Sequence, residues 1–370
     1  MALSTIQNNS FADTAVHGFR NIIINGAMQV AQRGTSSTTA VTAGVFHTVD
    51  RIKTGGSSSI GQWTASQDTD APAGFTNSYK LACTTADTSL AAGDHYGITY
   101  HPEGYHMDAV AKGTSDAKPL TLSFYLKATV TKTLVVELTD AGNARHVNFA
   151  VTPSATNTWE RIVLNIPADT SGSFNQGGTS KAGEINFWLS AGSTFTSGSV
   201  QSTWTTRSNA NIMAGVSNWA DSTSNAIWIT GLQLEVGSEA TPFEHRSFGD
   251  ELARCQRYYQ TIISEDAFTG FARANGNTSG NTRASCDGFR LLQTMRAKPT
   301  FSVSAASDFS IRTTSNVNVG SSDSVGSGRV SKTHINLYWD RSSGGVTYGD
   351  MFQIVANNTS SAAMYFDAEL

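Results

Sequence analysis

Three histidines and three carboxylates crowd into residues 94–108, the densest group of potentially reactive side chains in the sequence. Imidazole and carboxylate groups bind metal ions or transfer protons when they converge. Their spacing matches no motif such as His-Glu-x-x-His, so a metal or acid–base site is one interpretation. A polar, tyrosine-lined loop beside an edge strand is the other, and we favour it. The residues are Asp94, His95, His101, Glu103, His106 and Asp108, and the three histidines are weak metal candidates.

A hydrolytic nucleophile has no recognisable setting in this chain. None of the eight histidines belongs to a Gly-x-Ser-x-Gly or similar motif. Glycoside hydrolases use two carboxylates across a cleft, but most acids here alternate with apolar residues, which places them on the solvent side of strands. The acids in question are Asp94, Glu103, Asp108, Glu137, Glu160 and Glu184. We therefore expect a protein that is not an enzyme and has no catalytic residues.

Aromatic residues with polar neighbours offer a further chemistry, the binding of sugars. Ring faces stack on the C–H surfaces of pyranoses while amide and hydroxyl groups bind the sugar hydroxyls. Loop-like or edge contexts contain Trp63, Tyr96, Tyr100, Tyr105, Trp204 and Trp219, and the Gly344-Gly345 turn is flanked by Tyr338, Arg341 and Tyr348. These nine are the candidate carbohydrate-binding residues. Trp159, Trp188, Trp228 and Trp339 fall within strand patterns and are expected in the core.

The composition limits what the surface can bind. Charged residues make up 15% of the chain and the net charge is −4, with no basic run. A phosphate-binding groove or an anionic-membrane patch lacks the cations it needs, so we expect no nucleic acid partner and no membrane insertion. Gly, Ser, Thr and Asn recur throughout, and they favour turns and strands over helix interiors.

The cysteines and the N-terminus indicate where the protein is made. Cys83, Cys255 and Cys286 are far apart and form no Cys-x-x-Cys pair, so neither disulfides nor zinc are predicted. Three scattered thiols suit assembly in a reducing cytoplasm. The first residues lack a basic segment followed by an apolar one, and no apolar stretch approaches the length of a membrane span.

Short apolar or alternating runs, separated by Gly, Ser, Thr, Asn and Asp clusters, predict many short strands. In residues 120–126 the period of two places Leu120, Leu122, Phe124 and Leu126 on one face, which we assign to the core. Expected strands cover residues 21–30, 49–52, 79–84, 96–100, 120–129, 133–139, 147–151, 160–166, 185–190, 226–236, 290–295, 300–305, 309–313, 333–339, 351–356 and 363–370.

One helix interrupts the strands. Ser247 and Asp250 have the spacing of an N-terminal cap, and Leu252, Cys255 and Tyr259 recur at helical intervals. The prediction is all-β: an arm at residues 1–20, a jelly-roll-like β-sandwich at 21–246, a connecting helix at 247–260, and a smaller β-sandwich domain at 261–370. Residues 275–283 and 315–328 are expected to be exposed loops.

Three blocks of sequence resemble a module of bacteriophage tail-fibre and receptor-binding proteins, over roughly residues 21–259. The blocks are Asn21-Ile-Ile-Ile-Asn-Gly-Ala-Met-Gln-Val-Ala-Gln-Arg-Gly34, Ile229-Thr-Gly-Leu-Gln-Leu-Glu-Val-Gly-Ser238, and Thr241-Pro-Phe-Glu-His-Arg-Ser-Phe-Gly-Asp-Glu-Leu-Ala-Arg-Cys-Gln-Arg-Tyr-Tyr259. The third block is the most specific. Residues 260–370 carry no such likeness.

The first two blocks are more remotely similar to carbohydrate-binding-module jelly rolls. In those domains an Asn-Gly turn and acidic residues hold a structural calcium. Here Gln29 stands where an acidic ligand is expected and Thr230-Gly231 replaces an acidic pair. Hard cations need carboxylates, so we expect no cofactor.

The resemblance implies a virion structural protein, a tail fibre or spike, that attaches to a bacterial surface glycan. It implies a homotrimer that contacts other virion proteins, is assembled in the bacterial host cytoplasm, and has residues 261–370 as its receptor-binding tip. Weak sites in such an assembly gain affinity through multivalency. A capsid-surface fibre or tail decoration with a purely structural role is the alternative, and a polysaccharide depolymerase is a more distant one.

Overall fold

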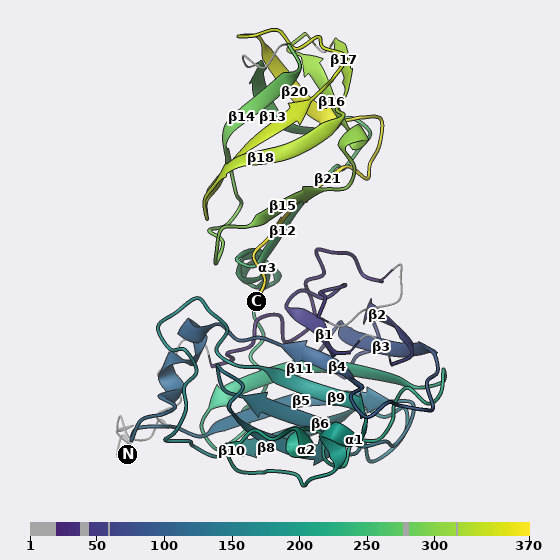
Figure 1. Cartoon of the computed structure of the whole chain (residues 1–370), viewed down its shortest axis with the longest axis vertical. Coiled ribbons are helices and arrows are strands. Elements are labelled where there is room, and N and C mark those ends of the chain that lie inside the picture. The colour runs from purple at the N-terminus through teal and green to yellow at the C-terminus, as the bar shows by residue number, and fades with distance from the viewer. Residues whose placement is uncertain (1–19, 38–43, 58–59, 277–280, 316) are drawn as a thin grey trace, which may run out of the picture. The chain divides into compact units, whose positions relative to one another are not determined.

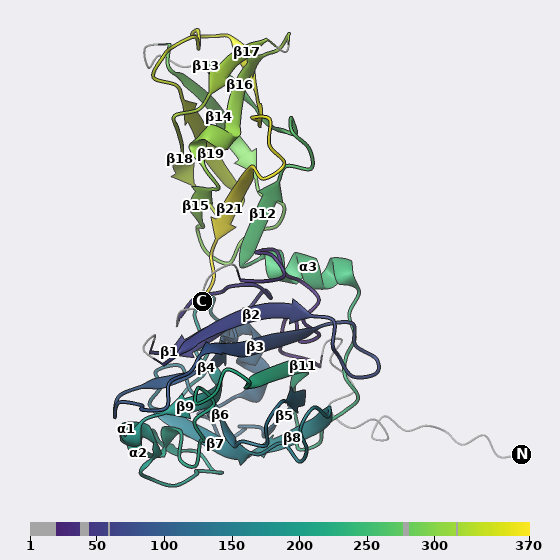
Figure 2. The ribbon, with the colours of Figure 1, turned by 90° about the vertical axis from the view of Figure 1, so that its right-hand side faces the viewer.

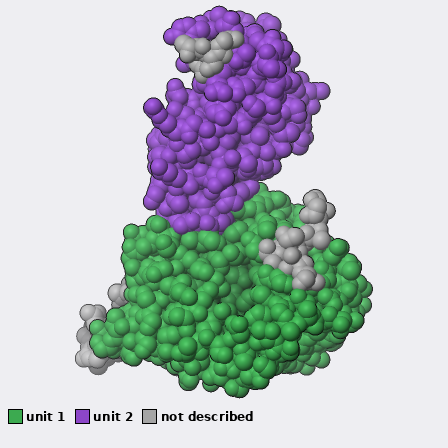
Figure 3. All heavy atoms as spheres, in the orientation of Figure 1, with its two compact units in different colours: residues 1–251, 370 green, residues 252–369 purple. Residues whose placement is uncertain are grey.

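The computed structural model describes residues 20–37, 44–57, 60–276, 281–315 and 317–370. The chain divides into two compact units (Figure 3). Unit 1 comprises residues up to 251 together with Leu370, and unit 2 comprises residues 252–369. The predicted arm at residues 1–20 lies almost wholly outside the described residues. Among the described residues, no helix is both long and apolar enough to cross a membrane.

Unit 1 contains a six-stranded and a five-stranded sheet (Figures 1 and 2). The first has the order β1-β4-β9-β6-β7-β10 and the second the order β2-β3-β11-β5-β8. The strands are β1 (Ile52–Gly56), β2 (Gln62–Asp68), β3 (Ser78–Thr85), β4 (His95–Tyr100), β5 (Leu120–Ala128), β6 (Leu134–Thr139), β7 (Arg145–Val151), β8 (Glu160–Ile166), β9 (Ile185–Ala191), β10 (Thr205–Thr206) and β11 (Ala226–Val236).

Alternation along the strands creates the core of unit 1. Successive side chains of a strand point to opposite faces, so Leu122, Phe124 and Leu126 of β5 enter the core while the residues between them face away from it. Phe124 meets Phe187 of β9 edge to face, with ring centroids 5.1 Å apart, which joins the two sheets. The all-β sandwich predicted from the sequence is confirmed.

Unit 2 has its own core and two further sheets. A three-stranded sheet has the order β12-β21-β15, and a seven-stranded sheet has the order β17-β16-β20-β13-β14-β19-β18. Phe309, Ile335, Trp339 and Phe366 are fully buried among its apolar side chains. The strands are β12 (Tyr259–Ile263), β13 (Gly270–Gly276), β14 (Arg283–Arg290), β15 (Thr300–Val303), β16 (Phe309–Thr313), β17 (Asn318–Ser321), β18 (Ser324–Val330), β19 (His334–Asp340), β20 (Met351–Ala356) and β21 (Ala363–Asp367).

Several local predictions in unit 1 are wrong. Residues 21–30 are largely buried but form no ladder, because side chains satisfy much of their backbone: the Asn25 amide bonds the carbonyls of Val30 and Asp50, at 2.8 and 2.9 Å. The edge strand β2 escaped prediction. So did two single-turn helices, α1 (Ser193–Thr196) and α2 (Asn209–Ile212), in a polar stretch without helical periodicity.

In unit 2 the expected loop at 315–328 contains strand residues: β17 pairs with β16, and β18, which begins at Ser324, pairs with β19. Residues 291–295, expected in a strand, lie outside any strand. Glycine-rich strands with few apolar residues do not give an alternating signal. The helix α3 (Phe248–Gln256) starts as predicted, with the Ser247 hydroxyl accepting from the Asp250 amide at 3.2 Å. It ends earlier than predicted, because Tyr259 already pairs with Asp367 of β21.

We expect two separate unfolding transitions, because each unit has its own buried core. Leu234→Ala in unit 1 and Leu337→Ala in unit 2 each remove a side chain that is at most 1% exposed. Each is expected to cost its own unit about 2–5 kcal/mol and to leave the other transition in place. Differential scanning calorimetry of the two variants measures this. A single transition that both variants lower equally would contradict it.

Candidate functional site

Four of the sequence-predicted sugar-binding aromatics are core residues. Trp63, Tyr96, Tyr100 and Trp219 are at most 1% exposed, so their predicted role in sugar binding is wrong, although Trp63 lies on an edge strand and Trp219 in a loop as expected. Trp63 points inward from β2 and stacks on Tyr96, with centroids 5.3 Å apart. The only apolar residue of β2 besides Trp63 is Ala65, so the alternation of this strand is weak in the sequence. Buried rings of this kind cannot offer a face to a ligand.

Tyr105 and Trp204 occupy different settings. Tyr105 is 53% exposed in the short 3₁₀ helix at Gly104–Val110. Trp204 is half-buried: its indole N–H donates to the Pro167 carbonyl at 2.9 Å and the Lys112 ammonium lies 4.4 Å from its ring centroid. Trp204 therefore helps to fix loops, and Tyr105 stays available on the surface.

The predicted patch of unit 2 is divided among separate contacts. Tyr338 lies under the Arg283 guanidinium, 4.0 Å from its ring centroid, and Arg283 pairs with Asp340. Arg341 donates to the carbonyl of Gly344, closing its own turn. Tyr348 is 67% exposed. These contacts give Tyr338 and Arg341 structural partners and leave Tyr348 as the accessible ring of the three.

The three histidine candidates have three different environments. The His95 ring packs against Trp188 and Phe195, at 5.6 and 4.7 Å between centroids. His101 is buried beside Glu184, and burial lowers the pKa of its imidazole, which stays neutral. His106 is partly buried in the 3₁₀ helix. Within the described ranges no three His, Cys, Asp or Glu side chains are grouped as metal ligands would be.

Glu137 is a fully buried acid whose partners the structure shows in detail. Its side chain extends from β6 on the side of the six-stranded sheet that faces away from the sandwich core, and it is 0% exposed. Its carboxylate accepts from Arg207 Nε at 2.8 Å, His146 Nδ1 at 2.9 Å, Trp188 Nε1 at 2.9 Å and Asn186 Nδ2 at 3.2 Å. Burial alone would raise the pKa of Glu137, but hydrogen bonds from His146 and Arg207 hold it below its ordinary value. The group is a satisfied buried anion, which fits a structural role.

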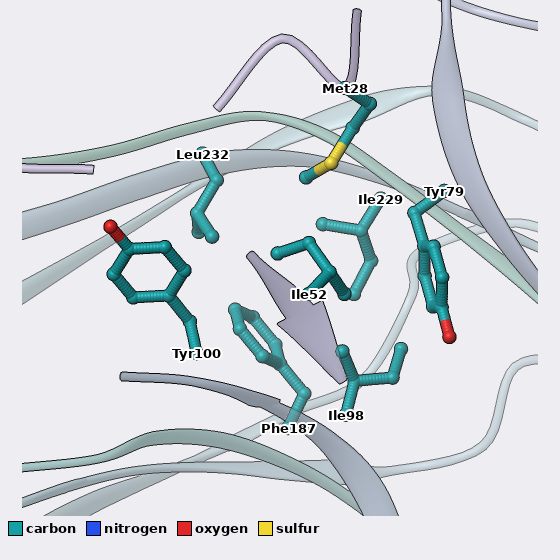
Figure 4. Close-up of a pocket in the computed structure, with 8 residues that line it drawn as sticks. All are labelled: Met28, Ile52, Tyr79, Ile98, Tyr100, Phe187, Ile229 and Leu232. Atoms are coloured by element: carbon teal, nitrogen blue, oxygen red, sulfur yellow. The ribbon is translucent and has the colours of Figure 1, made fainter. Parts of the chain in front are cut away.

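The core cavity of unit 1 is too small for a ligand. Met28, Ile52, Tyr79, Ile98, Tyr100, Phe187, Ile229 and Leu232 line it (Figure 4). Its volume is about 10 Å³, close to the smallest space that holds one water, and its lining is apolar. A binding site must therefore be sought on the surface.

Four rings gather on the outer face of the five-stranded sheet, and we name them the aromatic platform: Phe75, Tyr125, Phe243 and His245. Phe75 lies 5.3 Å from Tyr125, 4.9 Å from Phe243 and 5.1 Å from His245 between ring centroids. Phe243 and His245 lie 4.9 Å apart. His245 is exposed and the other three are partly exposed. The rings thus form a surface that the protein leaves uncovered.

Gly231 makes room for the platform. It has a φ of 60° at the irregularity where β11 shifts register against β5. A Cβ at this position would lie 2.8 Å from both the Phe75 and the Tyr125 ring. Only glycine allows the two rings to lie over the strand.

A second aromatic group adjoins the platform on the same face. Trp228 is the cross-strand partner of both Lys80 and Lys127, and their ammonium groups lie 4.8 and 5.3 Å from its ring centroid. Asp68 pairs with Lys80, and Asp70 pairs with Lys127. Trp228 is 7% exposed, so it is buried as predicted. Two lysine side chains cover it on the outer face of the sheet, and it does not belong to the sandwich core.

Sequence reasoning missed the platform. Tyr125 carried the one usable signal, since it alternates with Phe124 and Leu126 and so faces outward. Phe75 stands in one loop and Phe243 and His245 in another, both far from Tyr125 in the chain, and no local pattern brings them together.

No protein-family model and no curated protein matches the chain. Parts of solved structures are similar to it at low identity. The enzymatically active domain of tailspike protein 4 of bacteriophage CBA120 aligns with 58% of this chain at 13% identity and a TM-score of 0.30, and the match spans 21% of that domain's chain. A putative sugar-binding protein from Bacteroides thetaiotaomicron aligns with 59% of this chain at 11% identity and TM-score 0.33, over 100% of its own length. TmCBM61, solved with beta-1,4-galactotriose, aligns with 59% at 9% identity and TM-score 0.30, over 99% of its length.

Glu137→Gln is expected to destabilise unit 1 by roughly 3 kcal/mol at neutral pH, because it leaves Arg207 without its buried counter-ion. The folded-state pKa of Glu137 is lowered, so its contribution to stability is present above the ordinary pKa of 4.5 and is lost as the pH falls through the folded value. Urea unfolding from pH 7 to pH 3 measures this. The exposed Glu239→Gln is the control, and equal behaviour of both variants would refute the role of Glu137.

Proposed function

We propose that unit 1 binds a glycan through the aromatic platform. The observation that supports this most directly is the gathering of four partly open rings on one sheet face, fixed by contacts of 4.9–5.3 Å between ring centroids. Rings held in this way lose little conformational entropy when a pyranose stacks on them.

The polar groups directly beneath the platform hold it in place. Thr230, Ser123 and Gln233 lie on the outer face of the sheet beside Tyr125, but each is at most 1% exposed and so does not reach a ligand. Gln233 donates to Glu235 at 2.8 Å and accepts from the backbone N–H of Glu244, also at 2.8 Å. These bonds fix the backbone next to Phe243, so the sugar would be held mainly by the ring faces.

We further propose that this binding occurs without cleavage. The acids that a hydrolase would need have separate tasks: Glu137 is enclosed by its four donors, Glu160 accepts from the Ser154 amide at 2.9 Å, and Asp108 accepts from the Gly177 amide at 2.6 Å. Their separate partners support adhesion as the role of the protein.

The biological setting that we propose is a virion, where a homotrimeric fibre or spike attaches to a bacterial surface glycan. The three blocks that resemble phage tail-fibre modules support this, because they contact one another in unit 1. The side-chain amide of Asn21 in the first block donates to the Leu232 carbonyl of the second at 3.1 Å, and the backbone N–H of Asn21 donates to the Glu244 carboxylate of the third at 2.8 Å. The blocks thus behave as one structural module.

Tyr125→Ala is expected to weaken glycan binding at least tenfold, because it removes one of the four rings of the platform. Binding is measured on an array of bacterial surface polysaccharides and then by calorimetry on the best binder. Phe268→Ala, which removes an exposed ring of unit 2, is the control and should bind as the parent does. Equal binding by the Tyr125 variant would refute the platform.

The proposed virion role predicts a trimer at micromolar concentration and adsorption of the labelled protein to bacterial cells. Sedimentation velocity reports the mass, and fluorescence microscopy reports adsorption. No reducing ends should appear when the protein is incubated with the bound polysaccharide. A stable monomer that does not adsorb would argue for a different setting.

A further inference from the structure

Arg161 stands at the border of the aromatic platform with neutral partners only. It lies on the edge strand β8, directly across from Tyr125 of β5, and is exposed. Its Nη2 donates to the Thr241 carbonyl at 2.5 Å and to the Ser123 hydroxyl at 3.3 Å. Thr241 is two residues from Phe243, so these bonds hold the guanidinium beside the platform rings.

The other cations on this face are neutralised by the protein itself. Lys80 lies 3.2 Å from Asp68, and Lys127 pairs with Asp70. The carboxylates near Arg161 are also engaged: Glu235 accepts from Gln233 and Thr241, and Glu244 pairs with Arg246. Of the described residues that point outward from the five-stranded sheet, Arg161 is the one cation without a carboxylate partner.

We infer that the ligand is an anionic glycan and that Arg161 binds its negative group, an inference that rests on the proposed function of the platform. A guanidinium presents planar pairs of N–H donors that match a carboxylate or phosphate in two hydrogen bonds. Arg161 uses one nitrogen for its protein contacts, so donors on Nε and Nη1 remain for a ligand stacked on Tyr125. The net charge of the chain is −4, so a locally unpaired cation sets this border apart from its surroundings.

The test uses the full chain and an array of neutral, uronate-containing and phosphate-containing bacterial polysaccharides. Parent protein should prefer the anionic members, and raised salt should weaken that binding. Arg161→Gln should bind the best anionic member roughly 10- to 100-fold more weakly, and Arg161→Lys should fall between, because it keeps the charge and loses the paired donors. Lys332→Gln, an equal charge change at an exposed site of unit 2, should have no effect.

A second arm separates the two sources of charge. Reducing the carboxyl groups of a bound uronate polysaccharide to alcohols should abolish the difference between parent and Arg161→Gln, while a phosphate-containing ligand should be indifferent to that treatment. Thermal melting should show that Arg161→Gln folds as the parent does, since Arg161 is exposed and both of its partners are neutral.

Two failures remain distinct. Binding of neutral and anionic members that depends on Tyr125 and ignores Arg161 would overturn the anionic ligand and leave the platform standing. Binding that ignores Tyr125 as well would overturn the proposed function itself.

Discussion

The buried Arg246 guanidinium is the contact on which the arrangement of unit 1 depends. Its side chain is 4% exposed, and it donates to the backbone carbonyls of Asn21 and Ile23 while it pairs with Glu244 and Glu251. A buried charge is tolerated only with such partners, so the segments that supply them are fixed together. The Glu251 carboxylate also accepts from the backbone N–H of Asn25 at 2.6 Å. This cluster joins the first segment of the sandwich to the segment that follows its last strand.

The same cluster positions the aromatic platform. Residues 243–246 alternate: Glu244 and Arg246 bind the segment that begins at Asn21, while Phe243 and His245 extend to Phe75. Polar contacts on one side of a short segment thereby determine where two rings lie on the other side. The most specific sequence block is accordingly the one in which structural and proposed binding residues alternate.

The sequence predicted the parts of this protein in which alternation is strong. Strands such as β8 and β11 have the predicted limits, and the cap at Ser247 starts the helix where expected. Trp63 was misplaced because its strand contains few apolar residues. The platform was not predictable, since cross-strand register and the return of residues 243–245 over Gly231 are long-range outcomes of packing. The local sequence also does not show which charged side chains pair with each other. That pairing leaves Arg161 without a carboxylate partner, while Lys80 and Lys127 each have one.

The absence of a side chain at Gly231 is required for the aromatic platform. A side chain there would occupy the space in which Phe75 and Tyr125 lie, and the backbone conformation at that residue disfavours any substituent. The loops that supply Phe75 and His245 are free to exchange one ring for another and so to change the ligand. Residue 231, in contrast, must remain glycine. If the platform binds a glycan as proposed, changes of ligand would therefore arise in the loops, while the strand beneath them keeps its glycine.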